Sequence, residues 1–193
     1  MKKIIIVLLI ASVTKIQAQE EMQEKLREIP EAPEAYSAAT VAARMVEGLG
    51  FRFYWATEGL RPEDLAYKPS EEARTTEETI NHIYGLSRTV FLTVNGEAVV
   101  REENPPEGYE ATRDATLDYL DRASKILRAG ADLNELDIEF KGSSRSSTYP
   151  FWNLINGPIA DAIWHCGQVV SFRRSSGNPF NSKASLFTGK LRE

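Results

Sequence analysis

Three polar side chains stand out in a segment whose other residues are apolar or small. Asp161, His165 and Gln168 are the clearly polar residues between positions 158 and 170, at intervals of four and three residues. On a helix, this spacing places the three side chains along one stripe. Because the rest of the segment is apolar on nearly all sides, it predicts a buried helix. A carboxylate in such a helix needs a bonded partner, since leaving it unpaired costs several kcal/mol.

The chemistry that suits this stripe is the binding of a divalent metal ion. The chain has only two histidines, His82 and His165. Asp161 and His165 can reach one point because they lie four residues apart on a helix. Two imidazoles and one carboxylate from two facing helices leave coordination positions open for water or substrate. The sequence therefore predicts a metal site made of His82, Asp161 and His165.

Spacing alone leaves a second interpretation open. If Pro158 is the first helical residue, Asp161 lies at the end of the first turn, where the helix dipole favours a negative charge without any metal. His165 is then a packed core residue or a hydrogen-bond partner of Asp161. Cys166 is expected to be a small buried hydrophobe. We expect Gln168 to pack or to bond the backbone rather than to bind a metal directly.

Two motifs resemble those of the DinB/YfiT-like family of four-helix-bundle metalloenzymes. The first is "ETINHIYGL", which contains His82, and the second is "DAIWHCGQVVSFRRSSGNPF", far downstream. The family has a histidine early in its second helix and an H-x-x-x-H-x-G-Q pattern on its fourth. The resemblance covers residues 35–180. It implies a bundle that binds a divalent ion such as zinc, nickel, manganese or iron.

The resemblance also assigns ligand positions. His82 corresponds to the family's first ligand, and His165 with Gly167 and Gln168 corresponds to the last ligand and its tail. Asp161 stands where the family usually has a histidine. A carboxylate is still a competent ligand, but this departure leaves the identity and the affinity of the metal open.

Four amphipathic segments are predicted to position these residues. The second is the best defined, because Thr75 and Glu78 form a capping box and Asn95 with Gly96 ends the helix. The segments between helices are expected to be long crossing loops, with a short extended piece at "LDIEF" and no convincing sheet. The prediction is an all-α four-helix bundle. Its helices are expected at about 34–60, 75–95 and 113–129, with a fourth that carries the stripe and ends before Gly177.

Three residues disturb these predicted helices. Gly48 and Gly50 weaken the first helix by roughly 1 kcal/mol each relative to alanine. Pro158 precedes the stripe, and a proline inside a helix costs about 3 kcal/mol. We therefore expect the fourth helix to break or kink there.

The aromatic segment "FRFYW" at 51–55 is expected to pack in the core, with Arg52 solvated or paired with an acid.

The chain begins with the features of a secretory signal peptide. Two lysines precede an apolar run too short to span a bilayer, and a polar stretch follows that ends in Ala18. We expect a signal peptide over 1–18, export to the periplasm or medium, and no stable membrane anchor after cleavage. Residues 19–34 read as a loosely held acidic leader and 181–193 as a C-terminal tail, on either side of a bundle over 35–180.

The composition narrows the classes of partner. The 193 residues carry 23 basic and 28 acidic side chains, for a formal net charge of −5 without a basic cluster. This charge argues against nucleic acid as the main partner. Cys166 is the only cysteine, so no internal disulfide can form. The expected partners are a small-molecule substrate and, by the resemblance, a second copy in a homodimer.

Two functional hypotheses follow from these features. The first is a metal-dependent enzyme, a hydrolase or a transferase, in which the ion makes a bound water acidic. Hydrolysis is the more natural reaction for an exported protein, which meets little of the low-molecular-weight thiols that some members of the family use. The second hypothesis is a non-enzymatic binding or structural bundle with a degenerate metal site. It is favoured by Asp161 and by the lack of a recognisable general base.

Overall fold

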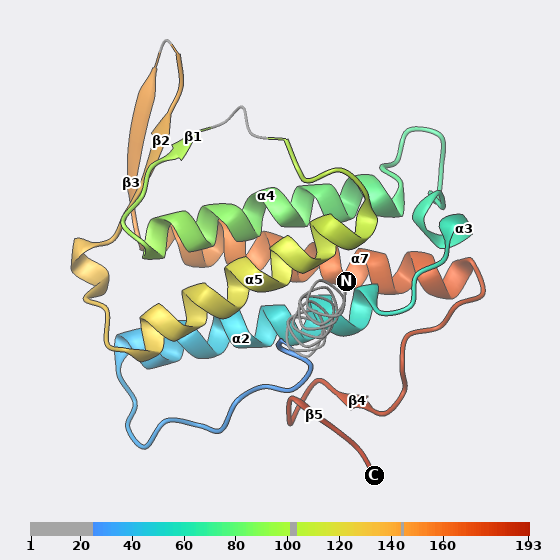
Figure 1. Ribbon diagram of the computed structural model, residues 1–193, viewed down its shortest axis with the longest axis horizontal. Coiled ribbons are helices and arrows are strands. Elements are labelled where there is room, and N and C mark those ends of the chain that lie inside the picture. The colour runs from blue at the N-terminus through green and yellow to red at the C-terminus, as the bar shows by residue number, and fades with distance from the viewer. Residues whose placement is uncertain (1–24, 101–103, 144) are drawn as a thin grey trace, which may run out of the picture.

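The computed structural model describes residues 25–100, 104–143 and 145–193 (Figure 1). The predicted signal peptide and its cleavage position lie outside these residues. Within the described part of the chain, no helix combines the length and the apolar character that crossing a membrane requires.

Four long helices form the core of the molecule, and together with the shorter helices they confirm the prediction of a mostly helical protein. Helices α2 and α4 each contact both α5 and α7, so the four enclose one core (Figure 1). Leu49 of α2, Ile83 of α4, and Leu117 and Leu120 of α5 are fully buried in this core. The helices are α2 (Ala38–Thr57), α4 (Thr76–Val94), α5 (Tyr109–Arg128) and α7 (Ala160–Ser175), and a short helix α3 (Pro62–Leu65) follows α2.

The helix boundaries follow from caps. The predicted capping box is confirmed, because the Glu78 amide donates to the Thr75 hydroxyl and the Thr75 amide donates to the Glu78 carboxylate. Helix α2 begins later than predicted, since Ser37 caps it. Helix α5 begins earlier than predicted, at Tyr109, directly after Gly108 in a left-handed conformation with φ of 90°.

A π-helical turn precedes α7 and accommodates Pro158. Helix α6 (Trp152–Leu154) continues into the π turn η2 (Ile155–Ile159), which leads directly into α7. Proline lacks the amide that an α-helix needs and clashes with the carbonyl one turn before it, and a wider turn relieves both problems. The predicted disturbance at Pro158 is therefore a π turn in a continuous helical segment and not a break.

The expectation of no convincing sheet is wrong. Strand β2 (Asp137–Lys141) pairs antiparallel with β3 (Ser146–Pro150) and parallel with β1 (Val99–Val100). The predicted extended piece "LDIEF" is confirmed as β2, which buries Ile138 against the helices. The hairpin projects from one end of the helices (Figure 1). The predicted crossing loops around 97–111 and 131–149 are thus partly strand, and the second also holds a 3₁₀ turn, η1 (Leu133–Glu135).

The two ends of the described chain pack against each other, so residues 25–31 are not held as loosely as predicted for the leader. Leu26 and Ile29 are buried, and the Ile29 amide donates to the Gly189 carbonyl at 2.8 Å. Gly189 lies in the hairpin of β4 (Ala184–Ser185) and β5 (Lys190–Leu191). Leu26 also explains one predicted weak point: a Cβ at Gly50 would lie 2.3 Å from the Leu26 side chain. The glycine in α2 therefore makes room for the leader.

Candidate metal centre

The three predicted ligands meet between α4 and α7. His82 lies two turns into α4, and Asp161 and His165 lie one turn apart near the start of α7. The Nε2 atom of His82 lies 3.2 Å from Asp161 Oδ2, and the Nε2 atom of His165 lies 3.3 Å from Asp161 Oδ1. The two imidazoles thus face different oxygens of one carboxylate. The sequence prediction that these three side chains converge is confirmed.

The spacing of the ligand atoms fits a metal ion. One ligand atom from each of the three side chains lies within 4.8 Å of the others. Ligand atoms about 2.1 Å from a tetrahedral ion are about 3.4 Å from one another. The separations between the imidazole nitrogens and the carboxylate oxygens are close to that value. Two imidazoles and a carboxylate also form a donor set that zinc and similar ions accept.

The triad lies at the surface of the helices, which corrects the prediction of a buried stripe. The side chains of His82, Asp161 and His165 are 34%, 38% and 14% exposed. Trp164, next to His165 in sequence, is 73% exposed, so α7 presents an open face to solvent. A carboxylate with this exposure does not require a metal to offset its burial. An ion bound at this position would be accessible to a substrate.

Gln168 determines which nitrogen of His165 faces the site. The Nδ1 atom of His165 lies 2.7 Å from the Gln168 Oε1 atom. Because an amide oxygen accepts, Nδ1 carries the proton and Nε2 keeps its lone pair for a ligand. A hydrogen bond to the second ring nitrogen is the usual way in which proteins orient a metal-binding histidine. The sequence prediction that Gln168 packs or bonds the backbone is wrong.

The electrostatics of the site keep His82 neutral. Partial burial lowers the pKa of His82, although its hydrogen bond with Asp161 opposes this effect, and the charge of Arg74 lowers the pKa further. Only the neutral imidazole has a lone pair available for a metal. The protonation state of His82 is therefore the one that a metal ligand requires.

Two helical glycines leave open space beside the triad. Gly85 lies one turn after His82 on α4, and Gly157 lies one turn before Asp161 in the π turn. A Cβ at either position would meet no heavy atom within 4 Å. Glycine inside a helix costs about 1 kcal/mol relative to alanine, and here no packing contact requires it. At these two positions the surface near the triad therefore carries no side chain beyond the backbone.

The remaining predicted residues have structural roles. Cys166 is buried, and burial raises the pKa of its thiol to about 12, as expected of a hydrophobe rather than a ligand. The aromatic residues of "FRFYW" are in the core, as predicted. Arg52 bonds the backbone of its own helix, since its Nη1 donates to the Gly48 carbonyl at 2.8 Å. Among the described residues, no acid pairs with it, so this part of the prediction is wrong.

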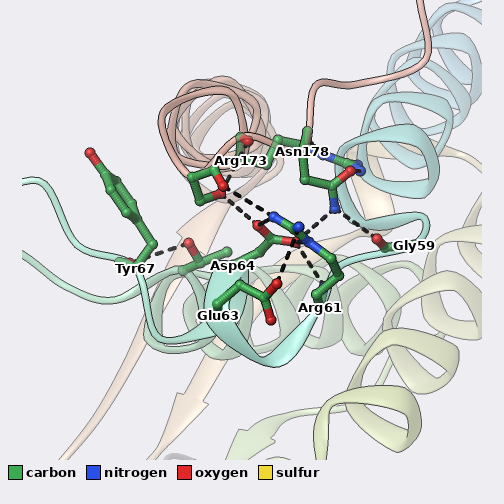
Figure 2. Close-up of polar contacts among 9 residues, drawn as sticks. Gly59, Arg61, Glu63, Asp64, Tyr67, Arg173 and Asn178 are labelled. Atoms are coloured by element: carbon green, nitrogen blue, oxygen red, sulfur yellow. Dashed lines mark hydrogen bonds and ion pairs between the residues drawn. The ribbon is translucent and has the colours of Figure 1, made fainter.

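A polar cluster that was not predicted from the sequence fixes the carboxyl end of α7. The fully buried Asp64 of α3 accepts hydrogen bonds from Arg61 at 2.8 Å, from Ser176 at 2.6 Å and from Asn178 at 2.7 Å (Figure 2). Ser176 and Asn178 follow α7 directly. Part of this cluster could have been predicted, because "RPED" places a carboxylate three residues after Arg61, as in a helix cap. No comparable pattern indicates that Ser176 and Asn178 bond this carboxylate.

The cluster continues through Arg173, which is buried in the last turn of α7. Its Nη1 atom donates to the carbonyls of Trp55 at 3.1 Å and Ala56 at 3.0 Å, at the end of α2. These carbonyls have no partner within their own helix, so the guanidinium satisfies them. Helix α7 is thereby held to both α2 and α3 at one end, while it carries two of the three candidate ligands nearer the other.

No family model, curated protein or solved structure matches this chain. The likeness to the DinB/YfiT-like family therefore rests on the two sequence motifs and on the residues that they contain.

Proposed function

We propose that this protein is a four-helix bundle of the DinB/YfiT-like type that binds a divalent ion and hydrolyses a small molecule. His82, Asp161 and His165 are the proposed ligands. The observation that carries the proposal is that both histidines of the chain direct Nε2 at one carboxylate. A zinc, nickel, manganese or iron ion suits this donor set.

Each residue of the proposed site has a defined task. His82 and His165 bind the ion as neutral imidazoles, and Asp161 offsets one of its two positive charges. Gln168 orients the His165 ring, and the space beside Gly85 and Gly157 admits a substrate. When bound, the ion supplies a Lewis acid and lowers the pKa of a water molecule, which is the chemistry of metal-assisted hydrolysis.

The test is metal analysis combined with turnover. We expect the purified protein to bind one equivalent of a divalent ion. We also expect it to hydrolyse at least one member of a panel of esters and amides. Thiol-transfer substrates serve as the comparison. His82→Ala and His165→Ala should abolish both properties. Asn81→Ala, next to His82 on α4, is the matched control and should keep them. Stoichiometric metal in both histidine variants would contradict the proposed ligands.

A second candidate function is a binding or structural bundle without turnover. One observation favours it: among the described residues, the group of potential ligands consists of these three side chains and contains no second carboxylate. This candidate predicts that metal binds and that no substrate of the panel is converted. Thiol transfer without hydrolysis would instead support the transferase form of the enzyme hypothesis.

We also propose that the protein is exported and cleaved after Ala18. The order of basic, apolar and polar segments at the start of the chain supports this proposal. Cleavage there retains Leu26 and Ile29, which the fold uses. Mass spectrometry of the protein from the periplasm or medium should give a chain that begins at Gln19. A chain that still begins at Met1 would contradict export by this route.

A further inference from the structure

A cavity lies at the end of the molecule where α2 begins and α5 ends. Its volume is about 660 Å³, and its lining comes from the first turns of α2, the segment after α5, Asp137 of β2, and the region of β3, α6 and the π turn. Small-molecule pockets typically have volumes of roughly 300–1,000 Å³. None of the candidate metal ligands lines this cavity. It is therefore a separate feature of the surface.

The walls of the cavity are mainly apolar. Trp152 is 75% exposed and Val41 is 49% exposed, although both have large side chains. Large apolar side chains left in water beside a cavity are typical of a surface that binds a ligand. Its volume and its walls suit an apolar chain or ring. The larger apolar side chains of the lining are Val41, Met45, Leu133, Phe151, Trp152 and Ile155.

The charged residues of the lining are all acidic. Asp132 and Asp137 line the cavity, and no lysine or arginine does. The amino end of α2 and the carboxyl end of α5 meet here, so their partial charges of about +0.5 and −0.5 offset each other. The negative charge of the two carboxylates therefore remains.

The arginines of the two neighbouring helices do not neutralise this charge. Arg44 of α2 and Arg128 of α5 both approach the buried carboxylate of Glu47. Arg128 also donates to the Glu31 carbonyl at 2.9 Å. Both guanidinium groups are thus directed at Glu47, and neither arginine nor Glu47 lines the cavity.

We propose that this cavity binds an amphiphilic cation, a molecule with an apolar chain or ring and a positively charged nitrogen. The apolar part fills the cavity, and the charged group lies near Asp132 and Asp137. The exposed indole of Trp152 adds an aromatic face, to which a cation is attracted. An anionic amphiphile of the same length is rejected by the same two carboxylates.

The test compares probes that share a ten-carbon chain and differ in the head group. Full-length protein, treated with a chelator so that a carboxylate probe finds no metal, is titrated by calorimetry with decyltrimethylammonium, decyl maltoside and decanoate. We expect one equivalent of the cation to bind at least ten-fold more tightly than decanoate, with the neutral probe between them. Equal affinity for the cation and the anion would overturn the proposal.

Variants locate the binding. Asp132→Asn combined with Asp137→Asn should reduce the preference for the cation several-fold. Glu110→Gln is the matched control, because it removes one exposed negative charge at the opposite end of the 20-residue helix α5 and should leave the preference unchanged. Ala131→Phe, which fills the cavity from a segment outside the helices, should abolish binding. Unchanged binding in Ala131→Phe would overturn the assignment to this cavity.

Discussion

At the residue scale, the candidate metal centre depends on one carboxylate. Asp161 lies on the first turn of α7 and faces His82 with one oxygen and His165 with the other. The His82 imidazole thus has a hydrogen-bond partner even without an ion, whereas Nε2 of His165, whose proton is on Nδ1, faces the carboxylate with a lone pair. The response of the triad to substitution separates a metal site from a group held by hydrogen bonds alone.

Substitutions of Asp161 should change metal affinity in opposite directions. Asp161→His introduces a third imidazole, which suits borderline-soft ions, and should keep or tighten the binding of zinc. Asp161→Ala removes a charged ligand and should weaken binding by about 1–3 kcal/mol. Calorimetric titration with zinc measures both effects. If Asp161→Ala binds zinc as tightly as the unmodified protein, Asp161 is not a ligand.

Gln168 should act on the metal only through His165. Gln168→Ala removes the acceptor for Nδ1, and loss of such a partner typically lowers metal affinity by about 10–100-fold. Gln168→Glu retains an acceptor oxygen and should restore much of the affinity. The unfolding free energy of the two variants is the control. An equal loss of affinity in both variants would show that Gln168 has a packing role.

At the scale of elements, α7 is positioned from both ends. The π turn at 155–159 leads into it, and the cluster around Asp64 holds the residues that follow it (Figure 2). The Arg61 guanidinium, together with the bonds from Ser176 and Asn178, holds the pKa of Asp64 well below its usual range, against the opposing effect of burial. The cluster therefore contributes stability that depends on pH.

Asp64→Asn should remove this pH-dependent stability. A carboxyl group with a lowered pKa in the folded state stabilises above its unfolded pKa, about 3.9, and loses that effect as the pH falls toward the folded value. At pH 7 we expect the variant to lose about 1–3 kcal/mol of unfolding free energy. Urea unfolding at pH 7 and pH 3 should show a smaller difference between variant and parent at the lower pH. A constant difference would contradict this role.

Two helical glycines should respond oppositely to alanine. Gly50→Ala forces Leu26 to move and should destabilise the protein by about 1–3 kcal/mol, the usual cost of overpacking. Gly85→Ala meets no neighbouring atom and should stabilise α4 by about 1 kcal/mol. Thermal unfolding of both variants measures these changes. A stabilising Gly50→Ala would mean that Leu26 does not pack on α2 as described.

At the scale of the whole molecule, the residue patterns predicted what is local, and the distant meeting of His82 with Asp161 and His165 was predicted through the family resemblance. The capping box of Thr75 and Glu78 and the spacing of Asp161 and His165 operate within single turns, so both could be predicted. The pairing of β1 with β2 joins residues about forty positions apart, at Val99 and Phe140, and the polar sequence of β3 shows no apolar alternation. Neither feature has a local signal.

The packing of residues 25–31 was missed for a similar reason. Leu26 and Ile29 are isolated apolar residues among charged ones, and a single apolar residue does not reveal whether it will be buried. Their partners, Gly50 and Gly189, lie 24 and 160 positions further along the chain. The stripe on α7 was predicted as buried because composition does not show which face of a helix lacks a neighbour.

The contact between residues 25–31 and the hairpin at 184–191 has a consequence for the order of folding. The second of these segments is synthesised about 160 residues after the first. Ile29 therefore has no partner at Gly189 until that hairpin has been made, and Leu26 and Ile29 cannot be fully covered before then. The core of the four helices does not need the hairpin, but the covering of the segment at 25–31 waits for it.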